Sequence, residues 1–165
     1  MNDTLKITNQ FMEIALKEAK LAKERDEIPV GAVIIDKNNN ILASNGNRVI
    51  ELSDPTAHAE ILCIREASKK LKNERLVDCT IFSSLEPCVM CASAISYARI
   101  KKLFFGAYDH KTGAVESGVK YFKTPSCNHR PEFYGGFKEK ESELILKSYF
   151  KLKCVSFVCL FTIYM

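Results

Sequence analysis

The sequence lacks the features that mark several large classes of protein. Its 165 residues contain no internal repeat, no Pro-rich linker and no low-complexity tract, and a chain of this length is expected to form one domain. Hydrophobic residues make up 47% and charged residues 27% of the chain, which excludes a disordered or fibrous protein. Residues 1–25 are charged throughout, with no apolar core before a cleavage site. We therefore expect no signal peptide and a cytoplasmic location.

No charge of one sign dominates, and no apolar run is long enough to cross a bilayer. Lys and Arg number 24 against 20 Asp and Glu, a net charge of +4, which is compatible with nucleic acid but does not establish it. The last twelve residues, 154–165, are apolar, whereas a membrane span needs about 20 residues. We predict no membrane span, a domain over residues 1–153 and an apolar tail. The tail is interpreted as a buried strand or a subunit contact, with an interfacial anchor or an atypical tail as the alternative.

Cysteine, in contrast, is abundant, and its count of seven is odd. Outside an oxidising compartment disulfides are not expected, so these thiols should be buried, bind a metal or act in catalysis. Five of them are interpreted as small buried hydrophobic residues or incidental thiols: Cys63, Cys79, Cys127, Cys154 and Cys159.

The periodicity of apolar residues predicts alternating helices and strands. Helices are predicted over residues 4–23, 57–71, 88–98 and 139–151. Strands are predicted over residues 30–35, 41–44, 80–83 and 102–107, with residues 133–134 in a further strand. The first two strands are expected to form a hairpin. Strands separated by helices indicate an α/β layered sheet.

Two short motifs carry the chemistry. His58 and Glu60 open one predicted helix, and Cys88 and Cys91 open another. Because the cysteines are three residues apart, they share a helix face and can bind one ion. The helix N-terminus also favours their thiolate forms. Two Cys and one His leave a fourth zinc position for water, the pattern of a catalytic site.

A catalytic zinc would lower the pKa of a bound water toward about 7, and Glu60 is predicted to carry the proton. H-x-E followed by P-C-x-x-C is the combination found in zinc nucleobase deaminases. The alternative is a structural site in which Cys63 supplies a fourth ligand. That alternative is disfavoured, because His58 and Cys63 are poorly placed on one continuous helix to share an ion.

Further segments extend the pattern beyond the zinc motifs, namely Ile28–Val33, Asp54–Glu60, Leu85–Cys91, Lys111–Ala114 and Asn128–Arg130. With these segments the chain, from about residue 11 to residue 153, resembles the bacterial tRNA-specific adenosine deaminases (the TadA family) of the cytidine-deaminase-like superfamily. The zinc motif alone fits the whole superfamily. The last two segments point to its tRNA-acting branch.

The resemblance implies a three-layer α/β/α sandwich with a five-stranded mixed sheet, a homodimer, and one Zn²⁺ per subunit. It implies hydrolytic deamination of adenosine to inosine at the wobble position of a tRNA anticodon stem-loop, with release of ammonia. His58, Cys88 and Cys91 match the zinc ligands, and Glu60 matches the proton shuttle. The residues expected to bind substrate are Asn47, which meets the flipped purine and its sugar, Ile28 in an apolar wall, Asp109 near the ribose–phosphate, and Lys111.

Two other functions remain open, and so does the role of one basic segment. A small-molecule deaminase of the guanine or cytosine type would keep the zinc site but would not need a local basic excess. A zinc-stabilised binding module without catalysis would have no use for Glu60. Residues 99–130 carry seven cations and two acids, a net +5, interleaved with aromatic residues. That segment is either a phosphate-binding and stacking surface or a solvated face over core phenylalanines.

Overall fold

The computed structural model describes the backbone of residues 2–162 and the side chains of residues 5–153. Over these residues the helices are α1 (Asn2–Glu24), α2 (Ala59–Leu71), α3 (Val89–Tyr97), α4 (Glu139–Thr162) and the 3-10 helix η1 (Tyr121–Lys123). The strands are β1 (Gly31–Ile35), β2 (Ile41–Gly46), β3 (Thr80–Leu85), β4 (Lys102–Ala107) and β5 (Glu132–Tyr134).

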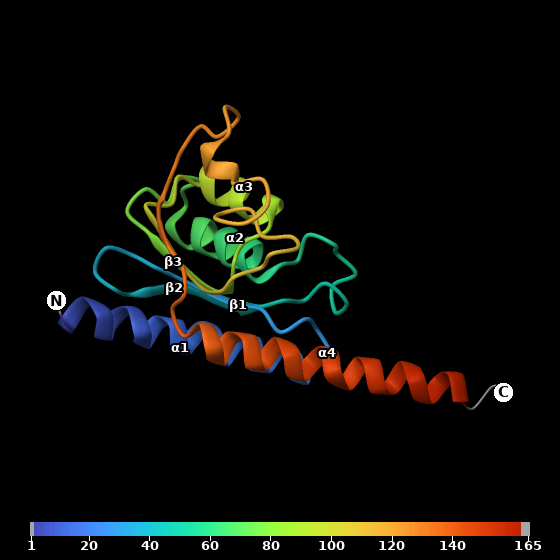
Figure 1. Ribbon diagram of the computed structural model, residues 1–165. Coiled ribbons are helices and arrows are strands. Elements are labelled where there is room, and N and C mark those ends of the chain that lie inside the picture. Colours follow the sequence, from blue (N-terminus) through green and yellow to red (C-terminus); the bar gives the residue numbers. More distant parts are fainter. Residues whose placement is uncertain (1, 163–165) are drawn as a thin grey trace.

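The five strands form one mixed sheet in the order β2-β1-β3-β4-β5. β1 is antiparallel to β2 and β3, whereas β4 is parallel to β3 and β5. Helices α1 and α4 cover one face of the sheet and α2 and α3 the other (Figure 1). The predicted three-layer sandwich with a five-stranded mixed sheet is therefore confirmed.

Helix α1 packs on the sheet through the apolar face that its sequence predicts. Phe11, Met12 and Ala15 are buried and pack with Val33 and Phe82 of the sheet. Close approach requires a glycine at residue 31, because a Cβ there would lie 2.1 Å from the carbonyl oxygen of Ala15. The position of α1 on the sheet therefore depends on close backbone contact at Gly31 as well as on hydrophobic burial.

The C-terminal part of the chain differs from the prediction. Helix α4 continues to Thr162 rather than ending near Lys151, so a strand within the apolar tail is wrong for residues 154–162. The side chains from Cys154 onward lie outside the described residues, and a subunit contact made by the tail stays a prediction. Among the helices that the structure describes, none is both long and apolar enough to cross a membrane.

The fold brings the two helices that carry the motifs together on one face of the sheet. Helix α2 follows the loop after β2, and α3 begins just after β3 ends. The two helices also contact each other. Their N-termini, each with non-helical φ and ψ at the residue before the helix, are therefore brought to one place.

Candidate functional site

The three predicted zinc ligands meet at the paired helix N-termini. His58 is the N-cap residue of α2 and Cys88 that of α3, and neither side chain caps its own helix. His58 Nδ1 lies 3.7 Å from Cys88 Sγ and 3.5 Å from Cys91 Sγ. The donor atoms of the three residues all lie within 4.8 Å of one another. No other residues between 5 and 153 form such a group.

Glu60 lies beside this group in a buried position. It is 3% exposed, accepts a hydrogen bond from Ser83 Oγ of β3 at 3.1 Å, and is 3.5 Å from Cys91 Sγ. Burial raises the pKa of its carboxyl group, because desolvation disfavours the charged form. A carboxyl group with a raised pKa binds a proton more readily, which suits a group that takes up a proton and then releases it.

The two cysteines differ in their readiness to ionise. Hydrogen bonds from Cys91 and from His58 lower the pKa of the Cys88 thiol to about 4, against its burial. The neighbouring Cys88 sulfur and burial raise the pKa of Cys91. The contact with Cys88 raises the pKa of His58. One sulfur is thus ready to bind a cation as the thiolate, the form in which cysteine ligates metals.

The chemistry of this donor set fits zinc. Imidazole nitrogen and two cysteine sulfurs are ligands that Zn²⁺ prefers, and three protein ligands are the number found in catalytic sites. The alternative with Cys63 as a fourth ligand is wrong, because Cys63 Sγ instead donates to the carbonyl of Ala32 at 3.3 Å. The His58, Cys88 and Cys91 cluster therefore fits one zinc per subunit.

The ligand group opens onto a cavity of about 720 Å³. His58, Cys88 and Glu60 line it, together with residues from loops on either side. This volume is within the range of small-molecule and cofactor sites. Helix α4 also contributes to the wall, through Leu146 and Phe150.

All four residues expected to bind substrate line the same cavity: Ile28, Asn47, Asp109 and Lys111. Asn47 is 5% exposed, and its Oδ1 accepts the N–H of Ala59 at 2.9 Å. This bond connects the start of the loop after β2 to the N-terminus of α2, the helix at which His58 and Glu60 lie. Asp109 Oδ1 accepts the N–H groups of Lys111 and Thr112, each at 3.0 Å, so its carboxylate also shapes its own turn.

Glu86, directly before the Pro87–Cys91 motif, is a functional residue that the sequence alone did not predict. Its carboxylate accepts the N–H groups of Asp109, Val115, Glu116 and Ser117 and the hydroxyl of Ser117, at 2.7 to 3.1 Å. Burial opposes its ionisation, but these donors outweigh that effect and lower its pKa. Glu86 therefore holds the 109–117 loop against the cysteine turn. Its position between a strand end and Pro87 was the sequence signal available.

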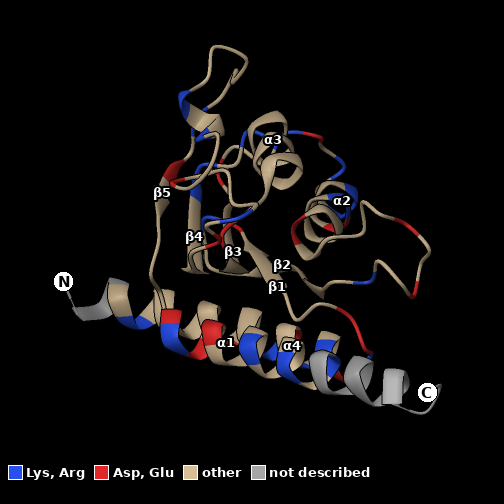
Figure 2. Ribbon diagram, turned by 45° about the vertical axis from the view of Figure 1, so that its right-hand side comes forward, with Lys and Arg blue, Asp and Glu red and all other residues tan. Residues whose placement is uncertain are grey.

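The basic segment 99–130 is not one surface around the cavity. Of its seven cations only Lys111 lines the cavity, and Lys102 pairs with Glu132 at 3.3 Å. Lys102 begins β4, and Lys120 and Lys123 lie at η1; the basic end of β4 lies away from α1 and α4 (Figure 2). Phe122 is 2% exposed and belongs to the core, whereas Tyr108 and His110 line the cavity. The segment thus serves partly as core and partly as site.

The remaining described cysteines fit their predicted structural role only in part. Cys63 and Cys79 are buried in the main core, and burial raises the pKa of the Cys79 thiol to about 11. Cys127 is half-buried and donates to the carbonyl of His129 at 3.0 Å. Cys154 and Cys159 lie outside the described side chains.

Comparisons with known proteins agree with this geometry. The family model for the cytidine and deoxycytidylate deaminase zinc-binding region matches residues 5–107. A tRNA-specific adenosine deaminase of Agrobacterium fabrum is 52% identical over 143 residues, covering 87% of this chain and 93% of that protein.

Two solved structures of deaminases also match the chain. A structure from work on A-to-I editing by tRNA:A34 deaminases at the wobble position of transfer RNA is 53% identical, with a TM-score of 0.81, and the match covers 83% of this chain and 99% of that one. A guanine deaminase of Bacillus subtilis is 37% identical, with a TM-score of 0.58 and coverage of 76% and 82%. The chain therefore belongs to the cytidine and deoxycytidylate deaminase family and, within it, to the tRNA-specific adenosine deaminases.

Proposed function

We propose that the chain catalyses the zinc-dependent hydrolytic deamination of adenosine to inosine at the wobble position of a tRNA anticodon, releasing ammonia. The observation that carries the proposal is the buried Glu60 beside the His58, Cys88 and Cys91 group at the cavity. A proton carrier at a three-ligand zinc site is what a hydrolytic deaminase needs. The tRNA-deaminating relatives support the choice of substrate.

In this reaction water adds to C6 of adenine and the amino group leaves as ammonia. His58, Cys88 and Cys91 would hold the zinc, which when bound supplies the Lewis acidity that makes water nucleophilic near neutral pH. Glu60 takes one proton from the attacking water and passes it to the purine ring nitrogen. It then takes the second water proton from the hydroxyl now on C6 and gives it to the leaving amine, so the C–N bond breaks, ammonia departs and the C6 carbonyl of inosine forms. Its hydrogen bond from Ser83 keeps the carboxylate aimed at the cavity.

The substrate contacts are part of the proposal. Asn47 uses its Oδ1 on Ala59, and none of the described residues accepts a hydrogen bond from its Nδ2, which leaves that amide group for the purine and its sugar. Ile28, which is 45% exposed, offers an apolar wall to the base. Asp109 and Lys111 would meet the ribose–phosphate. An anticodon loop base is already unpaired, so it enters such a cavity at lower cost than a base in a duplex.

The cellular setting follows from the substrate. We propose that the enzyme acts in the cytoplasm as a homodimer of two zinc-containing subunits, with residues 1–153 as the deaminase domain. The apolar tail, residues 154–165, is proposed to contact the other subunit.

The test is to incubate the purified protein with an anticodon stem-loop that has adenosine at the wobble position, and to sequence the product for adenosine read as guanosine. Free guanine, cytosine, adenosine and cytidine are assayed in parallel. We expect conversion of the stem-loop at that one position. Turnover of a free base or nucleoside alone would favour the small-molecule deaminase instead.

The Glu60→Ala protein is the matched control for this assay. We expect a loss of at least about 100-fold in rate, the usual contribution of a general acid–base group, while zinc remains near one equivalent per subunit by metal analysis. Unchanged activity would remove Glu60 from the mechanism.

A further inference from the structure

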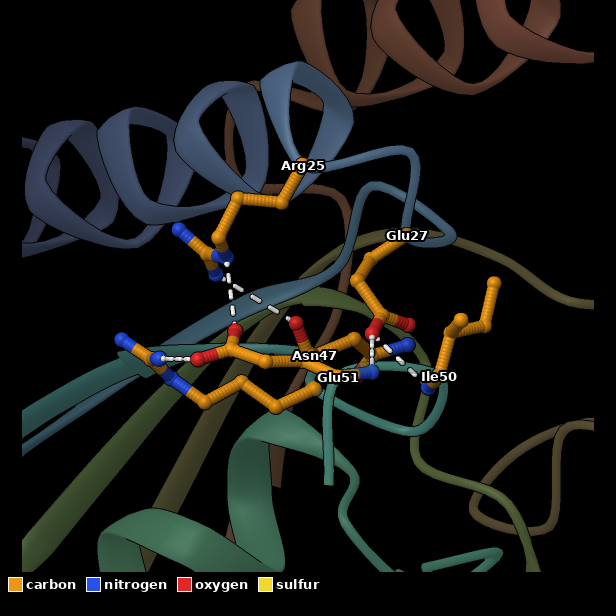
Figure 3. Close-up of polar contacts among 6 residues, drawn as sticks. Arg25, Glu27, Asn47, Ile50 and Glu51 are labelled. Atoms are coloured by element: carbon orange, nitrogen blue, oxygen red, sulfur yellow. Dashed lines mark hydrogen bonds and ion pairs between the residues drawn. The ribbon is translucent and has the colours of Figure 1, made fainter. Parts of the chain in front are cut away.

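Besides Glu60 and Glu86, one more buried carboxylate lies at the cavity, and it has no part in the proton transfer described above. Glu27 follows the end of α1, is 1% exposed and lines the cavity. Its Oε1 accepts two backbone hydrogen bonds, from the N–H of Ile50 at 2.8 Å and from that of Glu51 at 2.9 Å. Figure 3 shows the side chain reaching across to the turn that contains both residues.

Arg25 braces the same turn from the other side. Its Nη2 donates to the carbonyl oxygen of Asn47 at 3.3 Å, and its Nε lies 3.3 Å from Glu51 Oε2 (Figure 3). Glu51 Oε1 in turn pairs with Arg48 at 2.6 Å. Residues 25 and 27 therefore hold the 47–51 segment at several points, although more than twenty residues separate the two segments.

Core packing restrains this turn little, although the loop also has backbone hydrogen bonds of its own, such as that from the N–H of Leu52 to the carbonyl of Arg48 at 3.0 Å. Ile50 is 64% exposed and Leu52 50% exposed, so core packing does not fix this part of the loop. Burying a carboxylate is costly unless its oxygens accept hydrogen bonds, and Glu27 meets that need with the two N–H groups of the turn. A loop with so little apolar burial would otherwise be free to open locally.

The position of this turn matters for the site. Val49 and Ile50 line the cavity, and Asn47, at the start of the same loop, bonds to Ala59 beside His58. We propose that Glu27 is a positioning residue that holds the 48–51 turn as the cavity wall against which a polynucleotide substrate binds. The inference rests on the proposed function for the identity of that substrate, but not for the hydrogen bonds themselves.

Two conservative variants separate the hydrogen bonds from the charge. Because both bonds end on Oε1, Glu27→Gln can keep them while losing the charge. Glu27→Asp keeps the charge but is one methylene shorter, so it loses reach. We expect Glu27→Asp to raise KM for the stem-loop about tenfold, as misplaced binding groups do, with kcat changed less. Glu27→Gln should stay near wild type. The matched control is Glu24→Gln, because Glu24 is an exposed carboxylate at the end of α1. This variant should change neither KM nor kcat.

Amide hydrogen exchange on the full-length zinc-loaded protein gives a readout independent of activity. The Ile50 and Glu51 amides should lose protection in Glu27→Asp and keep it in Glu27→Gln. Equal KM in wild type and Glu27→Asp, with unchanged protection, would overturn the inference. A rise in KM for Glu27→Gln as large as that for Glu27→Asp would also overturn the inference, because the charge would then act directly on the substrate. If the wild-type protein converts no stem-loop, the proposed function fails, while the exchange result still decides whether Glu27 holds the turn.

Discussion

At the scale of single residues, two glutamates hold the loops that border the cavity. Glu86 holds the 109–117 loop and Glu27 the 48–51 turn, in both cases through backbone N–H groups. Each loop also presents residues to the cavity, among them Lys111 and Val49. Loops that bind substrate need such restraints, because they contribute little to the hydrophobic core.

Replacing Glu86 by Gln should destabilise the protein. The amide nitrogen would face groups that donate, so at least one buried N–H or hydroxyl loses its acceptor, at a cost of about 1–3 kcal/mol. Urea unfolding of the zinc-loaded protein measures this change. Glu74→Gln is the control, since the Glu74 side chain is 81% exposed. A difference between the two variants below about 0.5 kcal/mol would contradict the role of Glu86.

At the scale of elements, the positions of the helices in the sequence were easier to predict than the segments against which they pack. The apolar spacing of α1 predicted a helix with one apolar face, and Phe11 and Met12 of that face are buried, whereas Leu5 is 53% exposed. The helix predicted over residues 139–151 starts where α4 starts. That α4 runs beside α1 and forms part of the cavity wall was not predictable (Figure 1). It depends on contacts between distant segments, such as the Tyr149 hydroxyl bonding to the carbonyl of Asp26 at 2.9 Å.

Substituting Gly31 by Ala tests the packing of α1 on the sheet. The added Cβ would lie 2.1 Å from the oxygen of Ala15 and 2.4 Å from the nitrogen of Ala19, both backbone atoms. Because helix backbone cannot rotate away as a side chain can, we expect a loss of about 2 kcal/mol or more in unfolding free energy. Thermal and urea unfolding measure it, with the exposed hairpin variant Lys37→Ala as the control. Stability equal to wild type would show that α1 shifts freely on the sheet.

At the scale of the whole molecule, the predicted division into a domain and a tail has a direct test. A chain ending at Lys153 keeps the Tyr149 and Lys153 contacts to Asp26 and the entire cavity lining. We expect its zinc content and its kcat/KM for the stem-loop to match those of the full chain. A drop to monomers in sedimentation analysis, with the site intact, is the outcome expected of a tail that contacts the second subunit. Loss of zinc or of folding on truncation would contradict the domain boundary.

The candidate residues of the site could be predicted from the amino-acid sequence. His58, Glu60, Cys88 and Cys91 could be assigned because their spacing within two helix N-termini is local, and local geometry follows directly from chain position. The alternating helices and strands were predictable for the same reason. The net charge of residues 99–130 was a poor guide, since charge along the chain does not tell which cations face the cavity.

The residues that support the site could be identified only once the fold was known. The roles of Glu27 and Glu86 come from burial and from donors 23 to 31 residues away, which the sequence around each glutamate does not show. Phe122 was assigned to the core, and Tyr108 to the cavity, in the same way. These properties depend on which backbone groups, far apart in the sequence, are buried and so lose their hydrogen bonds to water. That is settled when the layers pack together, because buried polar groups must then find partners within the protein.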